Sequence, residues 1–380
     1  MRIAVDAKLL SNPGSGIGRY TAALLEHMIP MGHQWLLYSE RPFNSPLVDS
    51  PRVWKRTGHA LEGSIKGLRW SQLSFARWTL QDVVDLFWSP RHHLPFLLPR
   101  ETARVVTIHD MVWRQIPETM PRRRLWLERA LMGPSVRAAD KVICVSRFTA
   151  SEVSRYFPSA VGKCEVIPCA ADTEVAINTT PSFPAPEHFL LFVGTPEPRK
   201  NLPRLLRAYA SLREAAALPD LVLVGARGWG DDNLPALIQE LGIESRVHRP
   251  GHVSEADLQW LYAHATGLMM PSLYEGFGLP VLEAMQHGVP AIASSTSALP
   301  EVVGDAGLLV DPYSETEIAN AISALLHEPG LRDTLSQRAL ARAGRFSWQR
   351  AAEETLAVFE AAHAGHRPRA YRHQSMDHVL

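Results

Sequence analysis

The chain has 380 residues, which suits two domains of roughly 150 to 200 residues each. Lysine and arginine together number 39, as do aspartate and glutamate, so the net charge is zero and provides no global field that would attract nucleic acid. The three cysteines form no Cys-x-x-Cys pair, which argues against a zinc ribbon and a disulfide framework. No apolar run approaches the roughly 20 residues of a membrane span, and Asp6 and Lys8 interrupt any signal-peptide core. We therefore expect a protein that is cytoplasmic or peripheral on a membrane.

The first predicted element is an apolar strand from Arg2 to Ala7, followed by a glycine-rich segment and a helical pattern. Gly16 and Gly18 lie in that segment, where glycine lets backbone N–H groups approach a diphosphate. The spacing is not the strict G-x-G-x-x-G of dinucleotide-binding Rossmann domains. A dehydrogenase of that kind stays open as an alternative, because Glu40 ends the next predicted strand about where a ribose-binding acid would lie.

Further apolar runs at residues 83–88, 104–108 and 141–145 alternate with helical or loop segments, as in a parallel sheet covered on both faces. Ligands of such sheets bind at the carboxyl ends of the strands. His109 and Asp110 occupy that position after the second of these runs. A histidine at a strand end is more often a satisfied structural group than a catalyst, so the pattern alone leaves both roles open.

Two segments of this half, Leu68–Leu80 and Arg122–Leu127, interleave arginines with large aromatic residues. Basic and aromatic groups on one helix face are typical of contact with a membrane interface or an anionic lipid carrier. A solvated helix face with buried tryptophans explains the same composition. The sequence therefore predicts peripheral membrane contact as one of two interpretations.

Residues 179–188 are rich in proline and predict a semi-rigid linker. The apolar strand Phe189–Val193 opens a second domain, and the loop Gly194–Asn201 follows its carboxyl end. In that loop the planar fork of Arg199 and the compact charge of Lys200 could together neutralise a diphosphate. An adjacent basic pair is otherwise an ordinary solvated surface feature.

The stretch Ser272–Glu283 predicts a glycine turn that leads into a helix. Gly276 and Gly278 permit positive φ angles and close approach of a ligand, and Pro280 suits the first position of a helix. Unpaired N–H groups at such a helix start bind anions readily. A carboxylate beside a phosphate would repel it, so we expect the acids of this stretch to accept hydrogen bonds from hydroxyls, as on a sugar or ribose. Glycine turns and acids near a helix start also occur in ordinary strand–helix connections.

Glu275 and Glu283, with seven residues between them in P-S-x-Y-E-G-F-G-L-P-x-x-E-A-M, closely resemble the E-x7-E motif of retaining glycosyltransferases of the glycogen-synthase-like family four. The Thr-Ile-His-Asp element that ends at Asp110 and the Gly-x5-Lys-Asn loop that ends at Asn201 are also similar to elements of that family. The resemblance spans most of residues 2–360. It implies the GT-B arrangement, an α/β fold in which two Rossmann-like domains face a central cleft.

The implied domain organisation follows the predicted linker. An N-terminal, acceptor-binding domain would span residues 1–178, and a nucleotide-sugar-binding domain would span residues 189–345. A terminal helix at 346–363 would cross back to the first domain. The remaining residues, 364–380, have no clear periodicity and are expected to form a mobile tail.

The resemblance also implies roles for individual residues. Arg199 and Lys200 would stabilise charge on the departing diphosphate, Glu275 would bind hydroxyls of the donor sugar, and Glu283 would bind the ribose. His109 would contact the donor sugar and stabilise the transition state. Backbone groups of residues 251–253 would lie near the nucleotide base. The full set of further substrate-binding residues that we expect is Gly16, Gly18, Asp110, Gly251, His252, Val253, Gly276, Phe277, Gly278 and Leu279.

The implied reaction is front-face transfer of a hexosyl group with retention, to a glycan or polyprenyl-linked acceptor of surface-polysaccharide assembly. No Asp-x-Asp triplet occurs in the chain, so we expect neither a required metal ion nor another cofactor. The combination of the Arg-Lys loop and the E-x7-E stretch looks most like bacterial mannosyl- or rhamnosyltransferases, which favours mannose as the sugar and GDP-mannose as the donor. A sugar-nucleotide epimerase and a noncatalytic sugar-nucleotide-binding protein are the alternatives.

Overall fold

The computed structural model describes the whole chain except residues 12–13, 59–64, 172–180, 216–217, 230–232 and 367–380, and it describes residues 65–70 by their backbone alone. Contacts divide the chain into two compact units. The first comprises Met1–Met111, Arg123–Cys169 and the C-terminal segment from Trp348, and the second comprises Val112–Arg122 and Ala170–Ser347. The contacts thus divide the chain after Cys169, whereas the sequence placed the boundary at residue 178.

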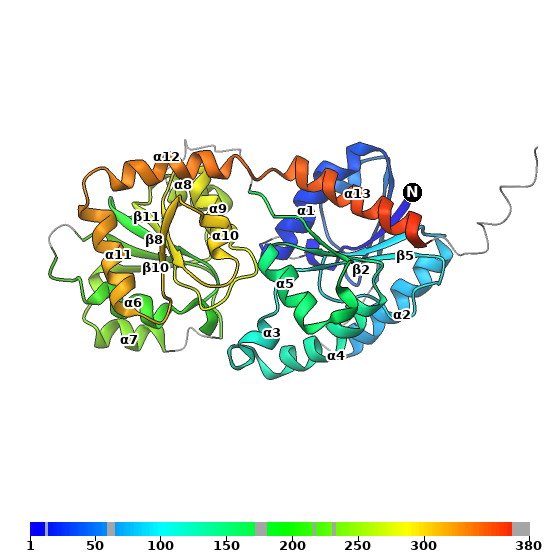
Figure 1. The fold of residues 1–380 in the computed structure, drawn as a ribbon, viewed down its shortest axis with the longest axis horizontal. Helices are drawn as coiled ribbons and strands as arrows, with labels where there is room; N and C mark the ends of the chain where they lie inside the picture. The colour runs from blue at the N-terminus through cyan, green and yellow to red at the C-terminus, as the bar shows by residue number, and fades with distance from the viewer. Residues whose placement is uncertain (12–13, 59–64, 172–180, 216–217, 230–232, 367–380) are drawn as a thin grey trace, which may run out of the picture. The chain divides into compact units, whose positions relative to one another are not determined.

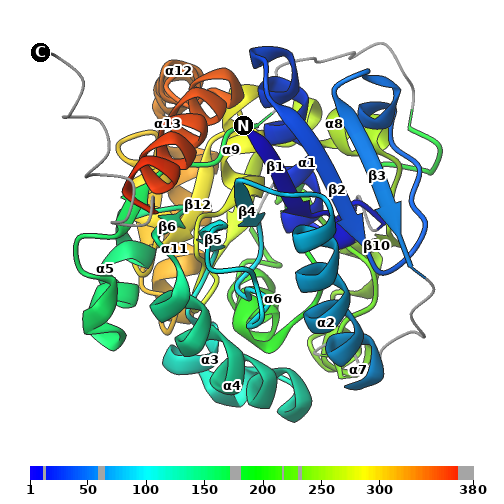
Figure 2. The same ribbon diagram turned by 90° about the vertical axis from the view of Figure 1, so that its right-hand side faces the viewer.

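The first unit is built on a seven-stranded sheet in the order β3-β2-β1-β4-β5-β6-β7, with every pair parallel. Strands β1, β2 and β3 run side by side at one end of it (Figure 2). The strands are β1 (Arg2–Asp6), β2 (Gln34–Ser39), β3 (Val53–Thr57), β4 (Leu86–Ser89), β5 (Ala103–Ile108), β6 (Lys141–Cys144) and β7 (Cys164–Val166). The α-helices are α1 (Gly16–Met28), α2 (Ile65–Gln81), α4 (Arg122–Ala138), α5 (Arg147–Tyr156) and α13 (Trp348–His366).

The terminal helix α13 belongs to this first unit, where it packs against α1, β5 and β6 (Figure 1). The ring of Phe359 lies 5.4 Å from that of Trp88 on β4. The helix runs three residues beyond the expected end at 363, because His366 is bound by Asp140 at 2.9 Å and by the carbonyl of Arg100 at 2.6 Å. The rest of the expected tail, residues 367–380, lies outside the described residues.

The second unit is built on a six-stranded parallel sheet in the order β10-β9-β8-β11-β12-β13. Its strands are β8 (Phe189–Val193), β9 (Asp220–Val224), β10 (Val247–Gly251), β11 (Gly267–Met270), β12 (Ala291–Ser294) and β13 (Gly307–Val310). Its α-helices are α3 (Val112–Gln115), α6 (Leu202–Ala210), α7 (Leu234–Glu240), α8 (Glu255–His264), α9 (Leu279–Gln286), α10 (Leu299–Val303), α11 (Glu315–His327) and α12 (Leu331–Ala343). Helices α6, α7 and α11 pack in one layer, and α8, α9 and α10 form another on the opposite side of the sheet (Figure 1).

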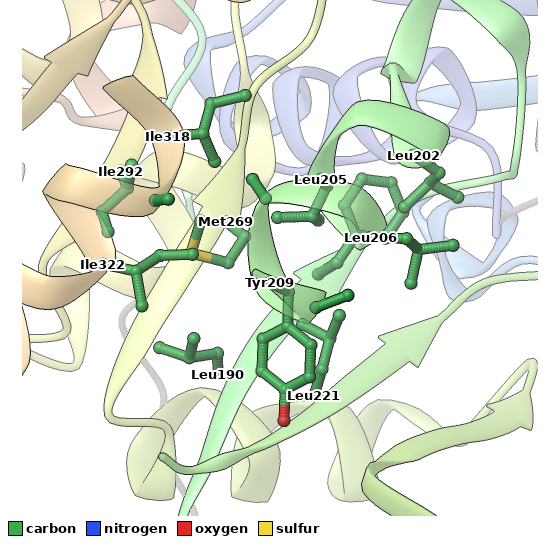
Figure 3. Packing of buried hydrophobic residues seen from close by; sticks show 14 of the residues in the cluster. Leu190, Leu202, Leu205, Leu206, Tyr209, Leu221, Met269, Ile292, Ile318 and Ile322 are labelled. Atoms are coloured by element: carbon green, nitrogen blue, oxygen red, sulfur yellow. The ribbon is translucent and has the colours of Figure 1, made fainter. Parts of the chain in front are cut away.

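Burial on both faces explains why these strands read as continuous apolar runs. All five residues of β8 are buried, and Leu190 packs in a core with Tyr209 of α6, Met269 of β11 and Ile322 of α11 (Figure 3). Such a core fixes the strands, so the loops at their carboxyl ends project from a rigid support. The sequence analysis did not predict β3, a largely exposed strand with the polar sequence VWKRT, or the partly exposed β13.

Side-chain hydrogen bonds explain where the contacts divide the chain. The carbonyl of Ala171 accepts a hydrogen bond from Gln286 at 2.8 Å, which holds the segment after Cys169 on the second unit. Within the same unit, the indole of Trp229 donates to the carbonyl of Thr119 at 3.0 Å. In the expected linker, residues 179–180 lie outside the described residues, and Ser182 binds the carboxylate of Asp257 through its backbone N–H and its hydroxyl, both at 2.8 Å.

Candidate active site

In the second unit, the loops after β8 and β11 meet at the carboxyl edge of the sheet. The backbone N–H of Leu273 donates to the carbonyl of Arg199 at 2.8 Å, which joins the two loops directly. Asn201 has a left-handed φ of 61° and donates its amide to the carbonyls of Pro271 and Pro312, at 2.9 and 2.6 Å. These bonds fix the loop that carries Arg199 and Lys200 against the loop that carries Glu275.

Glu275 lies between the two cations of the neighbouring loop. Its carboxylate accepts from Nη1 of Arg199 at 2.8 Å and from Nζ of Lys200 at 2.7 Å. Nε of Arg199 also donates to Glu197 at 2.7 Å. The side chains of Lys200 and Glu275 are only 8% and 9% exposed, so the ion pair is buried. The structure thus brings together the three residues that the sequence assigned to the phosphates and the donor sugar, and it engages them with one another.

The charges within this cluster determine the protonation states of Glu275 and Lys200. Burial by itself would raise the pKa of Glu275, but the positive charges of Arg199 and Lys200 outweigh it and lower that pKa to about 2. Burial also lowers the pKa of the Lys200 ammonium, and the negative charge of Glu275 opposes that effect. Glu275 is therefore an ionised hydrogen-bond acceptor at neutral pH and cannot act as a general acid there.

The glycine turn after Glu275 leads into helix α9, as predicted. Gly278 caps the helix with a φ of 110°, and a Cβ atom at this position would lie 2.6 Å from Cδ2 of Leu299. Only glycine fits both conditions. Of the two glycines that were expected to have a positive φ, Gly278 has one and Gly276 does not. The helix begins at Leu279, one residue earlier than expected, which places Pro280 in its second position.

Glu283 lies on α9 beyond its first turn, where the helix dipole has little influence on a carboxylate. Its carboxylate accepts a hydrogen bond of 2.6 Å from the hydroxyl of Tyr262 on α8, and both residues are buried. A carboxylate has two acceptor oxygens, so the bond from Tyr262 does not by itself exhaust its capacity to accept hydrogen bonds. This geometry is compatible with the ribose contact expected for Glu283, which stays a prediction.

A cavity of about 370 Å³ opens at the carboxyl ends of β8, β9 and β10. Apolar residues and glycines line it together with Arg227 and Arg249, and more of the lining surface is polar than apolar. Gly251 lines it, whereas His252 and Val253 do not belong to its lining. The sequence analysis missed both arginines. Arg227 lies in the loop at the carboxyl end of β9, the same kind of position as that of Arg199, whereas Arg249 lies within β10.

In the first unit, His109 follows β5 and is held in place by contacts on several sides. Its Nε2 donates to the carbonyl of Pro90 at 2.7 Å, and the ring of Tyr20 packs edge-on at 4.8 Å between centroids. Burial, with the charge of His92, lowers the pKa of His109 to about 4. The imidazole is therefore neutral at pH 7, and with Nε2 donating to Pro90 its Nδ1 is an acceptor suited to a hydroxyl group. Asp110 is half-buried beside it.

Gly16 and Gly18 lie in the first turn of helix α1 instead of in a loop. Ser15 caps this helix, and its hydroxyl oxygen accepts the N–H of Gly18 at 3.1 Å. That N–H is therefore already engaged within the protein. Tyr20, one helical turn after Gly16, contacts the ring of His109, so the start of α1 and the end of β5 lie together in this unit. Glu40, the acid of the dehydrogenase alternative, pairs with Lys8.

The two basic and aromatic segments differ in the structure. On α2, Phe75 is buried and Trp78 packs 5.4 Å from Tyr38, so these aromatic rings serve the core. The side chains of Leu68, Arg69 and Trp70 lie outside the described ones. On α4, Arg122, Arg123 and Arg124 are exposed, and Trp126 is 65% exposed. Among the described residues, no helix is both long enough and apolar enough to cross a membrane.

Two Rossmann-like units, with an Arg-Lys pair and two acids of an E-x7-E motif at the strand ends of the second, define a glycosyltransferase of the GT-B fold. The family profile "Glycosyltransferase Family 4" matches residues 14–175, and "Glycosyl transferases group 1" matches residues 178–342. A relative from Escherichia coli, "O-antigen chain mannosyltransferase B", is 32% identical over 95% of this chain and 100% of its own length. The chain therefore belongs to the glycosyltransferase family that these two profiles and this relative define.

A further relative is similar in sequence, and two solved structures share the fold. The "MMP alpha-(1->4)-mannosyltransferase" of Mycolicibacterium hassiacum is 33% identical over 68% of this chain and 65% of its own length. The solved sucrose-phosphate synthase of Thermosynechococcus elongatus shares the fold with a TM-score of 0.77 at 23% identity, covering 96% of this chain and 100% of that one. WaaG, a glycosyltransferase involved in lipopolysaccharide biosynthesis, has a TM-score of 0.74 at 17% identity and covers 94% of this chain and 99% of its own. These matches do not favour the epimerase and noncatalytic alternatives.

Proposed function

We propose that the enzyme transfers a mannosyl group from GDP-mannose, with retention, to a glycan or polyprenyl-linked acceptor of cell-surface polysaccharide. The cluster of Arg199, Lys200 and Glu275 carries the proposal, because it places two cations and an ionised acceptor in one site at the strand ends, where Lys200 and Glu275 are buried. The names of the E. coli and Mycolicibacterium relatives support mannose as the sugar.

In the proposed reaction, the bond between the sugar C1 and the diphosphate oxygen breaks and a bond from C1 to the acceptor oxygen forms on the same face. The proton of the acceptor hydroxyl passes to the departing phosphate oxygen, and GDP leaves. Arg199 and Lys200 stabilise the charge that develops on the diphosphate. The ionised Glu275 accepts hydrogen bonds from sugar hydroxyls, and Glu283 from the ribose. No protein carboxylate has to act as a nucleophile in this scheme.

His109 has a narrower role than a cationic stabiliser. Because its pKa is lowered to about 4, the imidazole carries no charge at neutral pH and interacts with the donor sugar as a hydrogen-bond acceptor. We expect His109→Ala to lower kcat by roughly 10- to 100-fold, the worth of about one lost hydrogen bond to a partly desolvated group. An unchanged kcat and donor KM would remove His109 from the site.

The cavity beside Gly251 suits the nucleotide base. Guanine presents O6 and N7 as neighbouring acceptors, to which one arginine can donate two hydrogen bonds. Arg227 and Arg249 line the cavity and can provide such a fork, while apolar lining residues such as Phe192 and Leu223 can contact the faces of a purine. This composition supports GDP over UDP as the nucleotide.

The donor is tested by thermal shift and by transfer assays with GDP-, UDP-, ADP- and dTDP-sugars. We expect GDP-mannose to stabilise the protein and to be consumed only in the presence of acceptor, and proton NMR to show the α-anomer retained in the product. Arg249→Gln and Arg227→Gln should raise the KM for GDP-mannose about tenfold. Arg207→Gln is the matched control, because Arg207 is exposed on α6 and lies outside the cavity. A preference for UDP-sugars, or an epimer formed without acceptor, would contradict the proposal.

Metal independence stays a prediction. Among the described residues, no group of three or more His, Cys, Asp or Glu side chains could hold a metal ion. We expect full activity after dialysis against EDTA. Loss of activity that manganese restores would show that the diphosphate is held by a metal ion and not chiefly by Arg199 and Lys200.

Peripheral membrane contact is proposed for the start of α4 alone. Exposed arginines next to the exposed Trp126 combine charge for anionic lipid with a ring suited to the interface. We expect binding to vesicles that contain phosphatidylglycerol, weakened by salt and by Arg123→Glu with Arg124→Glu. Exchange of Arg77, which is exposed on α2, is the control. Equal binding by both variants would leave α4 without this role.

A further inference from the structure

A buried histidine connects His109 to a carboxylate that plays no part in the proposed reaction. His92 is 5% exposed, and its Nε2 accepts the backbone N–H of His109 at 3.1 Å. Its Nδ1 lies 3.3 Å from Oε2 of Glu128, which is 7% exposed on α4. The hydroxyl of Ser89 fixes the surrounding turn by donating to the carbonyls of Arg91 and His93, at 2.8 and 2.7 Å. His92 therefore has a fixed partner at each ring nitrogen.

The two partners determine the tautomer of His92. An ionised carboxylate can only accept, so Nδ1 carries a proton toward Glu128. A backbone N–H can only donate, so Nε2 must be unprotonated toward His109. The arrangement exists only for the neutral ring. A proton on Nε2 would face the N–H of His109 and break that hydrogen bond.

We propose that neutral His92 is a positioning residue, which holds the backbone of His109 at the donor sugar, and that protonation of His92 releases this backbone and lowers the rate of transfer. The inference rests on the proposed function of His109. It gives the first unit a sensitivity to acid that comes from a residue outside the substrate contacts.

The charged groups around His92 determine the pH at which it becomes protonated. Burial lowers the pKa of His92, but the charge and hydrogen bond of Glu128, with a further contribution from Asp110, outweigh it and raise the pKa above its usual 6.5. Arg124 on α4 acts in the opposite direction. The N–H of His109 also favours the neutral ring, because only that form can accept it.

The other histidines nearby do not titrate in the same way. His93 contacts Glu128 at 3.0 Å but, within the described part of the chain, makes no hydrogen bond to His109, and burial lowers its pKa. The pKa of His109 is itself about 4. Glu128 has a pKa well below its usual value despite burial, because both neighbouring histidines stabilise its charge. His92 is therefore the histidine of this cluster whose pKa is raised above the usual value, with transfer present above that pKa and lost as the pH falls through it.

The test is the pH dependence of kcat in the wild type and four variants. In His92→Gln the side-chain oxygen can take the place of Nε2 and accept the N–H of His109 at any pH. The fall of kcat at low pH that is due to His92, called here the acid limb, should therefore disappear, while activity at pH 8 is retained. Glu128→Gln removes the charge that favours protonation, so the limb should move to lower pH by about one to three units. His93→Gln, the matched control, should keep the wild-type limb. His92→Ala should lower kcat at pH 8 about tenfold through the lost hydrogen bond.

A second measurement is independent of activity. In ¹⁵N-histidine-labelled protein, the ring nitrogens of His92, assigned by comparison with His92→Gln, should show the Nδ1–H tautomer at pH 8 and a proton gained at Nε2 over the range of the acid limb. If the acid limb of His92→Gln matches the wild type, or His92 stays neutral throughout it, the inference is wrong. Absence of mannosyl transfer by the wild type with any acceptor would instead refute the proposed function, while the NMR titration would still report on His92.

Discussion

The buried ion pair of the candidate active site predicts a large loss of stability when one partner is removed. Nζ of Lys200 lies 2.7 Å from Oε1 of Glu275, with side-chain exposures of 8% and 9%. The chain offers a matched comparison on its first unit. Nζ of Lys141 lies 2.6 Å from Oε1 of Glu165, with exposures of 25% and 43%. The two pairs share residue types and length and differ in exposure.

Removing one partner of a buried pair leaves an uncompensated charge and costs about 3–5 kcal/mol, whereas an exposed pair contributes about 0–1 kcal/mol. The contacts of Arg199 refine the estimate. Lys200→Met leaves Glu275 with the guanidinium of Arg199, so we expect the lower end, about 3 kcal/mol. Glu275→Gln leaves the buried Lys200 without its carboxylate, although Arg199 keeps Glu197, so we expect about 4–5 kcal/mol. Lys141→Met should cost less than about 1 kcal/mol.

The free energy of unfolding is measured by urea denaturation, with tryptophan fluorescence and circular dichroism followed together. In a unit of this size each kcal/mol lowers Tm by about 2–4 °C, which gives an independent check by calorimetry. The double variant, Lys200→Met with Glu275→Gln, completes a double-mutant cycle. We expect a coupling energy of at least about 1 kcal/mol between the two residues, because they are in contact. If Glu275→Gln lowers the free energy of unfolding by no more than Lys141→Met does, burial does not determine the strength of the pair of Lys200 with Glu275, and the reasoning is wrong.

Three further predictions concern the second unit. Gly225→Ala would place Cβ 2.2 Å from the carbonyl oxygen of Gly194, which is backbone and cannot move freely, so Tm should fall and the cavity beside it should distort, as calorimetry and nucleotide binding can show. Tyr262→Phe removes the phenol that binds Glu283 and should cost about 1–3 kcal/mol in urea denaturation, with a higher donor KM. The pKa of Glu275 is lowered to about 2, so its contribution to stability is fully present above its usual pKa near 4.5 and is lost as the pH falls toward 2, which acid denaturation of the wild type and Glu275→Gln will test.

Local signals explain what could be predicted from the sequence in the second unit. The fully buried strand Phe189–Val193 is a continuous apolar run, and the structure has it with those bounds. Gly278 and Pro280 mark a helix start that the structure confirms to within one residue. The pairing of Lys200 with Glu275 joins residues 75 apart in the chain, and no local pattern specifies it. Sequence reasoning placed both near the ligand without showing that they neutralise each other.

The first unit shows where local signals mislead. The glycines around Gly16 suggested a loop, but Ser15 provides an N-cap and the helix begins at Gly16 itself, while the substrate contact expected of Gly16 and Gly18 stays a prediction. Residue Val83, at the start of an apolar run, has a φ of 50° and lies before the strand, which begins at Leu86. Hydrophobicity alone cannot reveal such a turn, because it depends on backbone geometry. The contact between His92 and His109 likewise depends on the path of the loop after β4.

The charges around Glu275 lead to a last prediction, about nucleotide affinity. Arg199 and Lys200 contribute two positive charges, and Glu197 and Glu275 contribute two negative ones, so the cluster has a net charge of zero. A diphosphate that approaches it meets cations already bound to carboxylates and must compete for them.

Glu275→Gln leaves one net positive charge, so we expect it to bind GDP more tightly than the wild type at low salt, by calorimetric titration, and to transfer more slowly because the ionised acceptor for the sugar is lost. Glu283→Gln is the control, since Glu283 lies on α9 and accepts a hydrogen bond from Tyr262, and its GDP affinity should not rise. If Glu275→Gln weakens GDP binding while the protein stays folded, Glu275 serves to orient the two cations for the diphosphate, and the competition argued from net charge is wrong.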